Sequence, residues 1–290
     1  QDGGGTPPQR TTSWAAAGGS PAAQGGGEVC QAASGGGAGP ATACGAPGAA
    51  EAQALRVEVV RESPLVALAR GFASRAECRA LVRAGGAESE MRRAEVETNN
   101  NRGRAGNAQV RRSYSSAIQP PAPHTDSELG PLVARMFAVV RNLTGYDVHP
   151  EGQEPMSVNL YKDDGDEFRM HCDGACLGEP YTIGERAATS LLYCRAARRG
   201  GATSFMEGAL KIAPRRGDLL VFTYRDGRAA PAGAGAVHSA CPLRGGKKWV
   251  ATQWYREGVN ATFTAAAAEA ATRHLRRVGR PPWIRGGPGA

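Results

Sequence analysis

The chain has 290 residues, a length that allows one large domain or two small ones. Its net charge is +8 at pH 7, but the basic residues are scattered, with neither an aromatic-interleaved basic stripe nor a nucleic-acid-binding motif. We therefore expect no nucleic-acid partner. No apolar run approaches the about 20 residues that span a bilayer, so we also expect no transmembrane segment in this chain.

Residues 1–53 are dominated by glycine, alanine, proline, serine and glutamine. Between Gln1 and Ala50 the only large apolar side chains are Trp14 and Val29. Such a segment cannot bury enough apolar surface to offset the entropy lost when it becomes ordered. We therefore predict a disordered, low-complexity tail.

The pattern changes at residue 54. Residues 55–60 alternate between apolar and polar side chains, and residues 64–68 follow as a second predicted strand. Ser74 and Glu77 then form a capping box, in which each side chain bonds the other residue's backbone N–H. This box predicts a helix that ends near Arg83, before two glycines.

Residues 95–107 are polar and rich in asparagine and glycine, which predicts a loop, and residues 110–113 are predicted to lie on a strand. Thr125 and Glu128 form a second capping box. The apolar residues after it recur at helical spacing and end near Gly145. We therefore predict a helix that packs against a sheet.

From residue 157 onward, short strands and turns recur at nearly regular intervals, as in sandwiches, barrels and jelly rolls. An alanine-rich run then predicts a C-terminal helix, which we assign with its tail to residues 261–290. We expect a mainly β (α+β) fold. Residues 54–260 would form a double-stranded β-helix (jelly roll) with supporting N-terminal helices.

His171-Cys172-Asp173 offers two metal ligands at i and i+2, which lie on one face if the segment is a β-strand. His238 offers a second imidazole far downstream. Two histidines and one carboxylate on one face of a metal are the arrangement of non-haem Fe(II) oxygenases. Strand alternation would point Cys172 to the opposite face, so we do not count it as a ligand.

Other interpretations of these residues stay open. In the first interpretation, both histidines are ordinary, partly buried side chains that bind no metal. In another, Cys172 and Cys176 belong to a zinc site, although no second Cys or His pair has zinc-finger spacing. The order of the surrounding features favours the iron interpretation. In chain order they are the strand 157–161, a turn-rich segment, the H-x-D sequence, the apolar strand 188–194, Gly200-Gly201 before 202–205, Pro214 to Asp218 before 219–222, His238 to Pro242, and Lys247 to Trp254.

With these features the chain resembles the prolyl 4-hydroxylase family of Fe(II)/2-oxoglutarate dioxygenases. The resemblance covers roughly residues 55–258 and is strongest over 188–256. It implies that His171, Asp173 and His238 bind Fe(II), with 2-oxoglutarate, O2 and ascorbate as the other cofactors. It also implies hydroxylation of prolyl residues at the 4-position in a peptide or protein, with release of succinate and CO2.

Iron-chelated 2-oxoglutarate leaves a distal carboxylate that needs a cation in a dry pocket. The resemblance assigns this role to Lys248, whereas Lys247 falls on the other strand face. Tyr161, Thr189 and Trp254 occupy further co-substrate positions of the family. Arg111 and Ser113 match a V-R-x-S segment of its substrate groove.

The chain departs from the family pattern in two places. The stretch between Tyr161 and His171 is one residue longer, and the segment after Asp173 is short and lacks an aromatic residue. A non-prolyl substrate with the same cofactors is therefore an alternative. Catalytically silent peptide-binding modules of jelly-roll fold and metal-bearing cupin-like proteins are rivals, but neither needs Lys248. The family's usual location suggests the lumen of the endoplasmic reticulum or Golgi, and the oligomeric state stays open.

Overall fold

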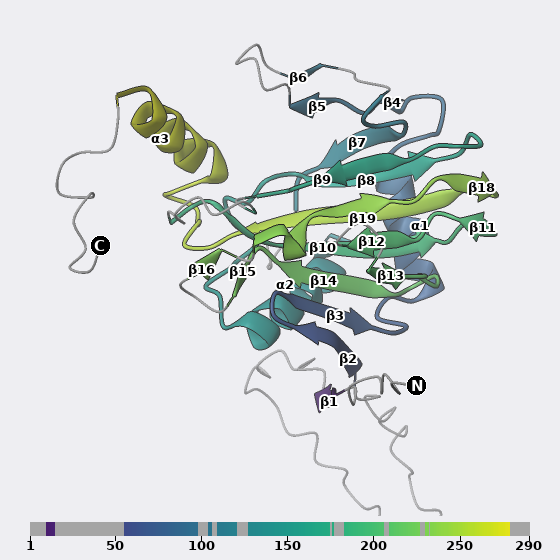
Figure 1. The fold of residues 1–290 in the computed structure, drawn as a ribbon, viewed down its shortest axis with the longest axis horizontal. Coiled ribbons are helices and arrows are strands. Elements are labelled where there is room, and N and C mark those ends of the chain that lie inside the picture. The colour runs from purple at the N-terminus through teal and green to yellow at the C-terminus, as the bar shows by residue number, and fades with distance from the viewer. Residues whose placement is uncertain are drawn as a thin grey trace, which may run out of the picture.

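The computed structural model describes residues 10–14, 55–97, 104–105, 109–120, 127–174, 176, 183–205, 209–226, 230–231 and 233–278. Its centre is an antiparallel nine-stranded sheet (Figure 1). In spatial order the strands are β1 (Arg10–Trp14), β2 (Leu55–Glu62), β3 (Leu65–Ala69), β14 (Leu219–Thr223), β10 (Arg186–Arg195), β19 (Lys248–Arg256), β8 (Met156–Tyr161), β7 (Tyr114–Ile118) and β4 (Arg92–Arg93).

A smaller antiparallel sheet faces one side of the large one. Its four strands, in spatial order, are β13 (Leu210–Ile212), β12 (Thr203–Phe205), β17 (His238–Ala240) and β9 (Phe168–His171). Three two-stranded ladders complete the sheets: β5 (Val96–Glu97) with β6 (Arg104–Ala105), β11 (Arg199–Gly200) with β18 (Leu243–Gly245), and β15 (Arg225–Asp226) with β16 (Ala230–Pro231). The described residues are thus mostly β with few helices, which confirms the mainly β part of the predicted fold class.

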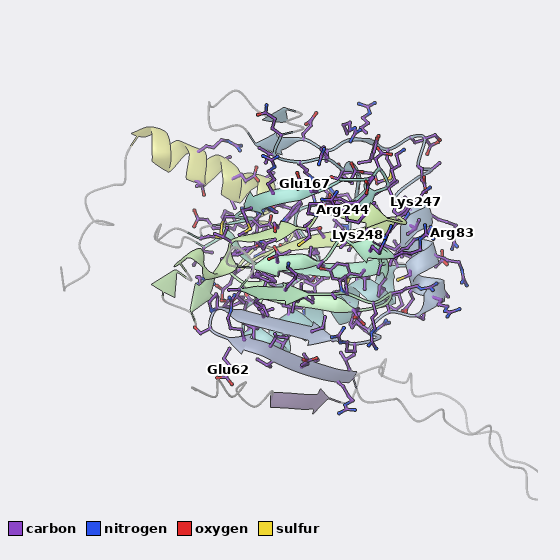
Figure 2. The ribbon with its side chains drawn as sticks, turned by 45° about the vertical axis from the view of Figure 1, so that its right-hand side comes forward. Glu62, Arg83, Glu167, Arg244, Lys247 and Lys248 are labelled. Atoms are coloured by element: carbon purple, nitrogen blue, oxygen red, sulfur yellow. A yellow bond between two sulfur atoms is a disulfide. The ribbon has the colours of Figure 1, made fainter. Side chains whose placement is uncertain are left out.

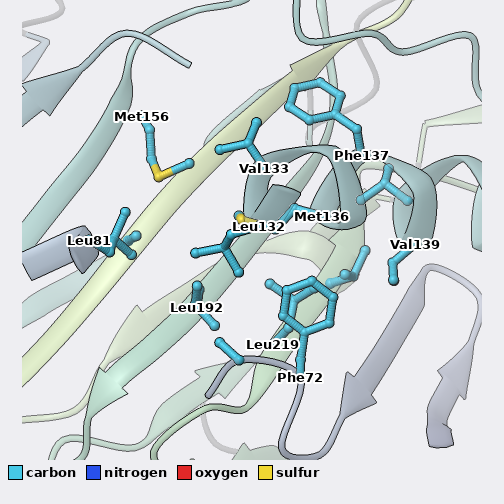
Figure 3. Close-up of a cluster of buried hydrophobic side chains, with 14 of the residues drawn as sticks. Phe72, Leu81, Leu132, Val133, Met136, Phe137, Val139, Met156, Leu192 and Leu219 are labelled. Carbon is cyan, nitrogen blue, oxygen red and sulfur yellow. The ribbon is translucent and has the colours of Figure 1, made fainter. Parts of the chain in front are cut away.

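The large sheet separates two hydrophobic cores because successive side chains of a strand point to opposite faces. Trp249 and Ala251 of β19 join the core that helices α1 (Arg75–Ala84) and α2 (Gly130–Thr144) cover. Figure 3 shows part of this core, with Leu132 and Met136 of α2 close to Leu192 of β10. Val250 lies in the second core, which fills the space between the two sheets.

The helices near the N-terminal side form largely as predicted. The Glu77 N–H donates to Ser74 Oγ at 3.2 Å, and the Ser74 N–H donates to the Glu77 carboxylate at 2.8 Å, so the first capping box is confirmed. Helix α2 begins instead after Leu129, which makes no side-chain cap bond. Thr125 of the second predicted box lies outside the described residues. Gly145 ends α2 with a φ of 67°, a left-handed conformation that glycine adopts without strain.

Residues 110–113, predicted on a strand, precede β7 instead. The Arg112 N–H donates to the Glu167 carbonyl at 2.8 Å, and Arg111 forms an isolated bridge with Phe168. The segment therefore pairs beside β9 before the chain enters the large sheet. Most of the predicted loop over 95–107 lies outside the described residues, although its β5 and β6 segments pair with each other.

The two ends of the chain are described in part. β1, within the predicted disordered tail, pairs antiparallel with β2, and its threonines and tryptophan are residues that favour strands. The rest of residues 1–53 lies outside the described part. The predicted C-terminal helix is α3 (Ala265–Val278). Its Glu269 carboxylate forms an ion pair with Arg256, with Nη2 and Oε1 2.8 Å apart. Within the described ranges, no helix combines the length and apolar character needed to cross a membrane.

Candidate metal and co-substrate site

Three potential metal ligands meet between the two sheets. His171 ends β9, His238 begins β17, and the two residues pair directly in the small sheet. Asp173 follows in a bend. Nε2 of each histidine lies 3.5 Å from a different Asp173 carboxylate oxygen, and one ligand atom from each residue lies within 4.8 Å of the others. The fold thus brings together the three residues that the sequence singled out, although β9 ends before the carboxylate.

Backbone carbonyls orient both imidazole rings. Nδ1 of His171 lies 2.7 Å from the Arg169 carbonyl oxygen, and Nδ1 of His238 lies 3.1 Å from that of Ala236. Because a carbonyl only accepts, each Nδ1 is the donor of this bond, and each Nε2 faces Asp173. Burial, with the nearby His171, lowers the pKa of His238 to about 4, so the ring is neutral, the form that binds metal.

Asp173 is fixed from behind by side chains of the large sheet. The Thr189 hydroxyl donates to Oδ2 at 2.9 Å and also contacts the Tyr224 hydroxyl. Arg186 Nη1 donates to the Asp173 backbone carbonyl at 2.8 Å. Burial alone would raise the pKa of Asp173, but the two histidines hold it well below its usual range. The carboxylate therefore stays ionised and available to a cation.

Arg186 is itself held in a buried ionic cluster. Two of its nitrogens donate to the Glu154 carboxylate at 2.7 and 2.5 Å, and Arg256 donates to the same carboxylate at 2.6 Å. The Arg186 guanidinium also lies 4.2 Å from the Trp254 ring centre. Each cation thus has a partner, and the cluster gives the Asp173 bend a rigid support.

A buried cation, Lys248, lies in the same pocket as the triad. Its side chain is 2% exposed, and burial lowers its pKa to about 8. Its ammonium lies 5.1 Å from the Tyr161 ring centre and 5.4 Å from that of Tyr193. Within the described part of the chain, no carboxylate forms an ion pair with it, whereas Lys247 beside it pairs with Glu88 at 2.6 Å. Figure 2 labels both lysines, of which Lys248 is the first residue of β19 and Lys247 precedes it.

The pocket runs from this lysine past the triad to Trp254. Four alternate residues of β19 line it, as one face of a strand must. The residues around the pocket are Arg111, Asn159, Tyr161, Phe168, His171, Asp173, Leu191, Thr203, His238, Ser239, Ala240, Lys248, Val250, Thr252 and Trp254. The Trp254 indole N–H is buried, and none of the described residues accepts a hydrogen bond from it. It is therefore a donor that a bound molecule can use.

Arg111 forms one wall of the pocket. Its Nε donates to Ser113 Oγ at 3.0 Å, and its Nη2 donates to Asn159 Oδ1 at 2.5 Å. The guanidinium lies 4.6 Å from the Phe168 ring centre, and Phe168 in turn stacks on His171. The Phe168 ring therefore lies between Arg111 at the pocket wall and the imidazole of His171.

Seven of the nine residues singled out in the sequence line the pocket, and Ser113 and Thr189 do not. Ser113 is fully buried behind Arg111, and Thr189 contacts Asp173. Sequence reasoning missed Asn159, Val250 and Thr252. Strand alternation from Tyr161 and Lys248 is the signal that would have found them, because each lies two or four residues from a predicted pocket residue on its own strand.

Comparison with known proteins identifies the domain that carries this site. Residues 156–256 match the family model of the 2OG-Fe(II) oxygenase superfamily. Prolyl 4-hydroxylase subunit alpha-3 of Bos taurus is 29% identical over 209 residues, which are 71% of this chain and 36% of that protein. Subunit alpha-1 of Homo sapiens is 33% identical over 132 residues, 44% of this chain and 24% of that protein. Residues 156–256 are therefore similar to 2OG-Fe(II) oxygenases and lie in a chain that is similar to prolyl 4-hydroxylase subunits.

The chain spans only about a third or less of the length of these curated relatives. Solved structures similar to it include a viral collagen prolyl hydroxylase from Paramecium Bursaria Chlorella virus-1 in a 2OG complex. That match has 20% identity and a TM-score of 0.48, and it covers 66% of this chain and 96% of the viral one. A Trichoplax adhaerens prolyl hydroxylase in complex with a hypoxia inducible factor peptide fragment has 18% identity and a TM-score of 0.45, over 66% and 83% of the two chains. All three candidate metal ligands and Lys248 fall inside the region 156–256 that matches the oxygenase model.

Proposed function

We propose that this chain is an Fe(II)- and 2-oxoglutarate-dependent dioxygenase that hydroxylates prolyl residues in a peptide or protein. One observation carries the proposal: the His171, Asp173 and His238 cluster shares a pocket with a buried lysine that has no carboxylate partner among the described residues. A metal ion would bind the histidine and aspartate cluster, and a dicarboxylate that chelates this metal would pair its second carboxylate with the lysine. The oxygenase family implies the same pair, Fe(II) and 2-oxoglutarate.

The donor set fits Fe(II). Two neutral imidazole nitrogens and one carboxylate are the ligands that non-haem iron oxygenases use, and no cysteine contributes to the cluster among the described residues. Thr189 and the two carbonyl-bonded Nδ1 atoms hold the donors in orientation, as outer partners of metal ligands do. Bound iron would supply the activation of O2 that couples 2-oxoglutarate decarboxylation, with release of succinate and CO2, to hydroxylation.

Lys248 fits the distal carboxylate of 2-oxoglutarate. A buried carboxylate without a cation is strongly disfavoured, and a buried ammonium without an anion is disfavoured for the same reason. Tyr161, whose ring centre lies 5.1 Å from the ammonium, also lines the pocket and carries a hydroxyl group. The chain's own part is therefore to position the co-substrate and keep water from it, and ascorbate would serve as the reductant that the family uses.

The prolyl substrate is supported by the relatives, which are subunits of prolyl 4-hydroxylases. Arg111, with Ser113 behind it, lies at the pocket wall where a peptide can reach the triad. A hydroxylase of another side chain would use the same iron and 2-oxoglutarate residues. Whether the enzyme hydroxylates a prolyl residue or another side chain depends on the residues of the pocket wall rather than on the metal cluster.

The same proposal includes the sheet topology and the cellular location of the protein. The strand order of the two facing sheets supports a double-stranded β-helix within one domain over residues 54–260. The bond between Cys172 and Cys176 is of a kind that persists in oxidising compartments, which supports a location in the endoplasmic reticulum or Golgi lumen.

Succinate release from 2-oxoglutarate, measured with Fe(II), O2, ascorbate and a panel of proline-rich peptides, tests the proposal. We expect peptide-stimulated succinate release and a mass gain of one oxygen on a proline. His238→Ala, which removes one metal donor, should abolish both. Turnover without any hydroxylated proline would overturn the prolyl assignment, and absence of turnover by the iron-loaded protein would overturn the dioxygenase.

A further inference from the structure

A disulfide encloses the carboxylate of the candidate metal cluster. Cys172 directly follows His171, and Cys176 lies four residues later, with the two Cα atoms 6.0 Å apart. Asp173 therefore lies inside a short covalent ring. Among the cysteines that the structure describes, Cys78, Cys194 and Cys241 are free thiols. The sequence placed two cysteines beside Asp173, and only the structure shows that they are bonded to each other.

The bend that carries Asp173 has little secondary structure to hold it. β9 ends at His171, so Asp173 belongs to no strand ladder. On one side the bend is held by the hydrogen bonds from Thr189 and Arg186. Gly174 lies so close to Tyr224 that an added Cβ would come within 2.6 Å of that ring. The bend is thus pressed against the large sheet, with no room for a larger residue.

The disulfide anchors the bend on its other side. Cys176 is 1% exposed and belongs to the core between the two sheets, and Cys172 is partly buried against the same core. The bond ties the end of β9 to a residue fixed in that core. A five-residue covalent ring allows far fewer backbone conformations than an open segment of the same length. The position of the Asp173 carboxylate is therefore restricted before any metal arrives.

We propose that the Cys172–Cys176 disulfide is a covalent clamp that sets the metal affinity of the triad, so that reduction by a thiol or phosphine weakens metal binding. This inference is based on the proposed function, because it takes the triad as a metal site. Reduction by a dithiol breaks one S–S bond and transfers two electrons and two protons, which gives two cysteine thiols and an oxidised, cyclic reductant. The open bend then has to be ordered at the expense of binding free energy, since a preorganised site loses less entropy on binding.

The test measures Mn²⁺ binding to the whole chain, without turnover. Mn²⁺ suits the imidazole and carboxylate donors, and as a harder cation it has little affinity for the thiols that reduction exposes. We expect the oxidised protein to bind it, and a phosphine reductant or the Cys172→Ser/Cys176→Ser variant to weaken the affinity about tenfold or more, the size of effect found for outer partners of metal ligands. Cys241→Ser, which removes a free thiol outside the pocket lining, should bind like the wild type.

The possible results distinguish the disulfide clamp from the metal site on which it is based. Equal Mn²⁺ affinity in the oxidised and reduced protein would overturn the clamp and leave the metal site intact. Failure of the oxidised wild type to bind Mn²⁺ would overturn the metal site and the clamp with it. If the double serine variant does not fold, the reduced wild type, checked by circular dichroism and by recovery after reoxidation, gives the answer alone.

Discussion

Lys248 and Tyr161 pair directly across the ladder between β19 and β8, and the lysine ammonium lies 5.1 Å from the centre of the tyrosine ring. The register turns Lys248 into the pocket and leaves its neighbour Lys247 at the surface, paired with Glu88. Two consecutive lysines, one just before β19 and one at its first position, thus lie in two different environments.

This difference makes the two lysines a matched pair for a test of co-substrate binding. Lys248→Ala should raise the KM for 2-oxoglutarate by about thirtyfold or more, because leaving a desolvated charge unpaired costs on the order of 2–5 kcal/mol. Lys247→Ala should change it less than about twofold, since an exposed ion pair contributes little. Steady-state kinetics at saturating peptide give both values. Similar effects at the two positions would show that Lys248 does not bind the co-substrate.

The same lysine predicts a pH dependence of stability in the protein without metal or co-substrate. Burial lowers the pKa of Lys248 from 10.5 to about 8, so the unfolded chain binds more protons between these values. The free energy of unfolding should therefore rise with pH across that window, by about 2 kcal/mol between about pH 7 and pH 9.5. Lys248→Met should be more stable than the wild type at neutral pH and should lack this component.

Urea unfolding of wild type, Lys248→Met and Lys247→Met at both pH values isolates the effect. Tyrosine and cysteine titrations are common to all three proteins and cancel in the differences. The Lys247 variant should follow the wild type, because that side chain is 39% exposed. If Lys248→Met shows the wild-type pH dependence, the lysine does not titrate in this range.

Thr189 is a positioning residue in this structure, because it touches Asp173 and does not line the pocket. Thr189→Val keeps the shape and removes the donor, so Mn²⁺ or Fe(II) affinity should fall about tenfold, as for other outer partners of metal ligands. Thr189→Ser restores the hydroxyl and should recover most of the affinity. Direct metal titration is the measurement. A purely structural role would lower stability in Thr189→Val while leaving metal affinity unchanged.

The sequence predicted much of the site because strand alternation is a local property. Lys248 was expected on the strand face opposite Lys247, and Trp254 was assigned by the family resemblance; the structure places both in the pocket. Tyr161 also lines the pocket, and the turn that follows it is closed by Asp166, which accepts hydrogen bonds from the Lys162 and Asp163 N–H groups.

What the sequence did not reveal depends on contacts between distant residues. The bond between Arg111 and Asn159 joins positions that only the sheet pairing brings together. Cys172 and Cys176 were visible in the sequence, but their bond depends on the backbone turn after β9. The H-x-D sequence was expected on one strand, whereas β9 ends at His171 and the Asp173 carboxylate is held by Thr189 instead.

Arg111 provides the last prediction, which concerns the peptide. Its planar guanidinium donates to Ser113 and Asn159 at once and lies over Phe168, an arrangement that a lysine ammonium cannot reproduce. Arg111→Lys should therefore lower kcat/KM for the peptide about tenfold or more. Peptide-independent decarboxylation of 2-oxoglutarate needs only the metal and Lys248, and it should stay within about twofold of the wild type because losing one wall contact leaves both in place. Arg112→Lys is the control, since Arg112 bonds Gly165 and Glu167 and does not line the pocket. A parallel loss of both activities in Arg111→Lys would place the arginine in the metal and co-substrate site rather than in the peptide groove.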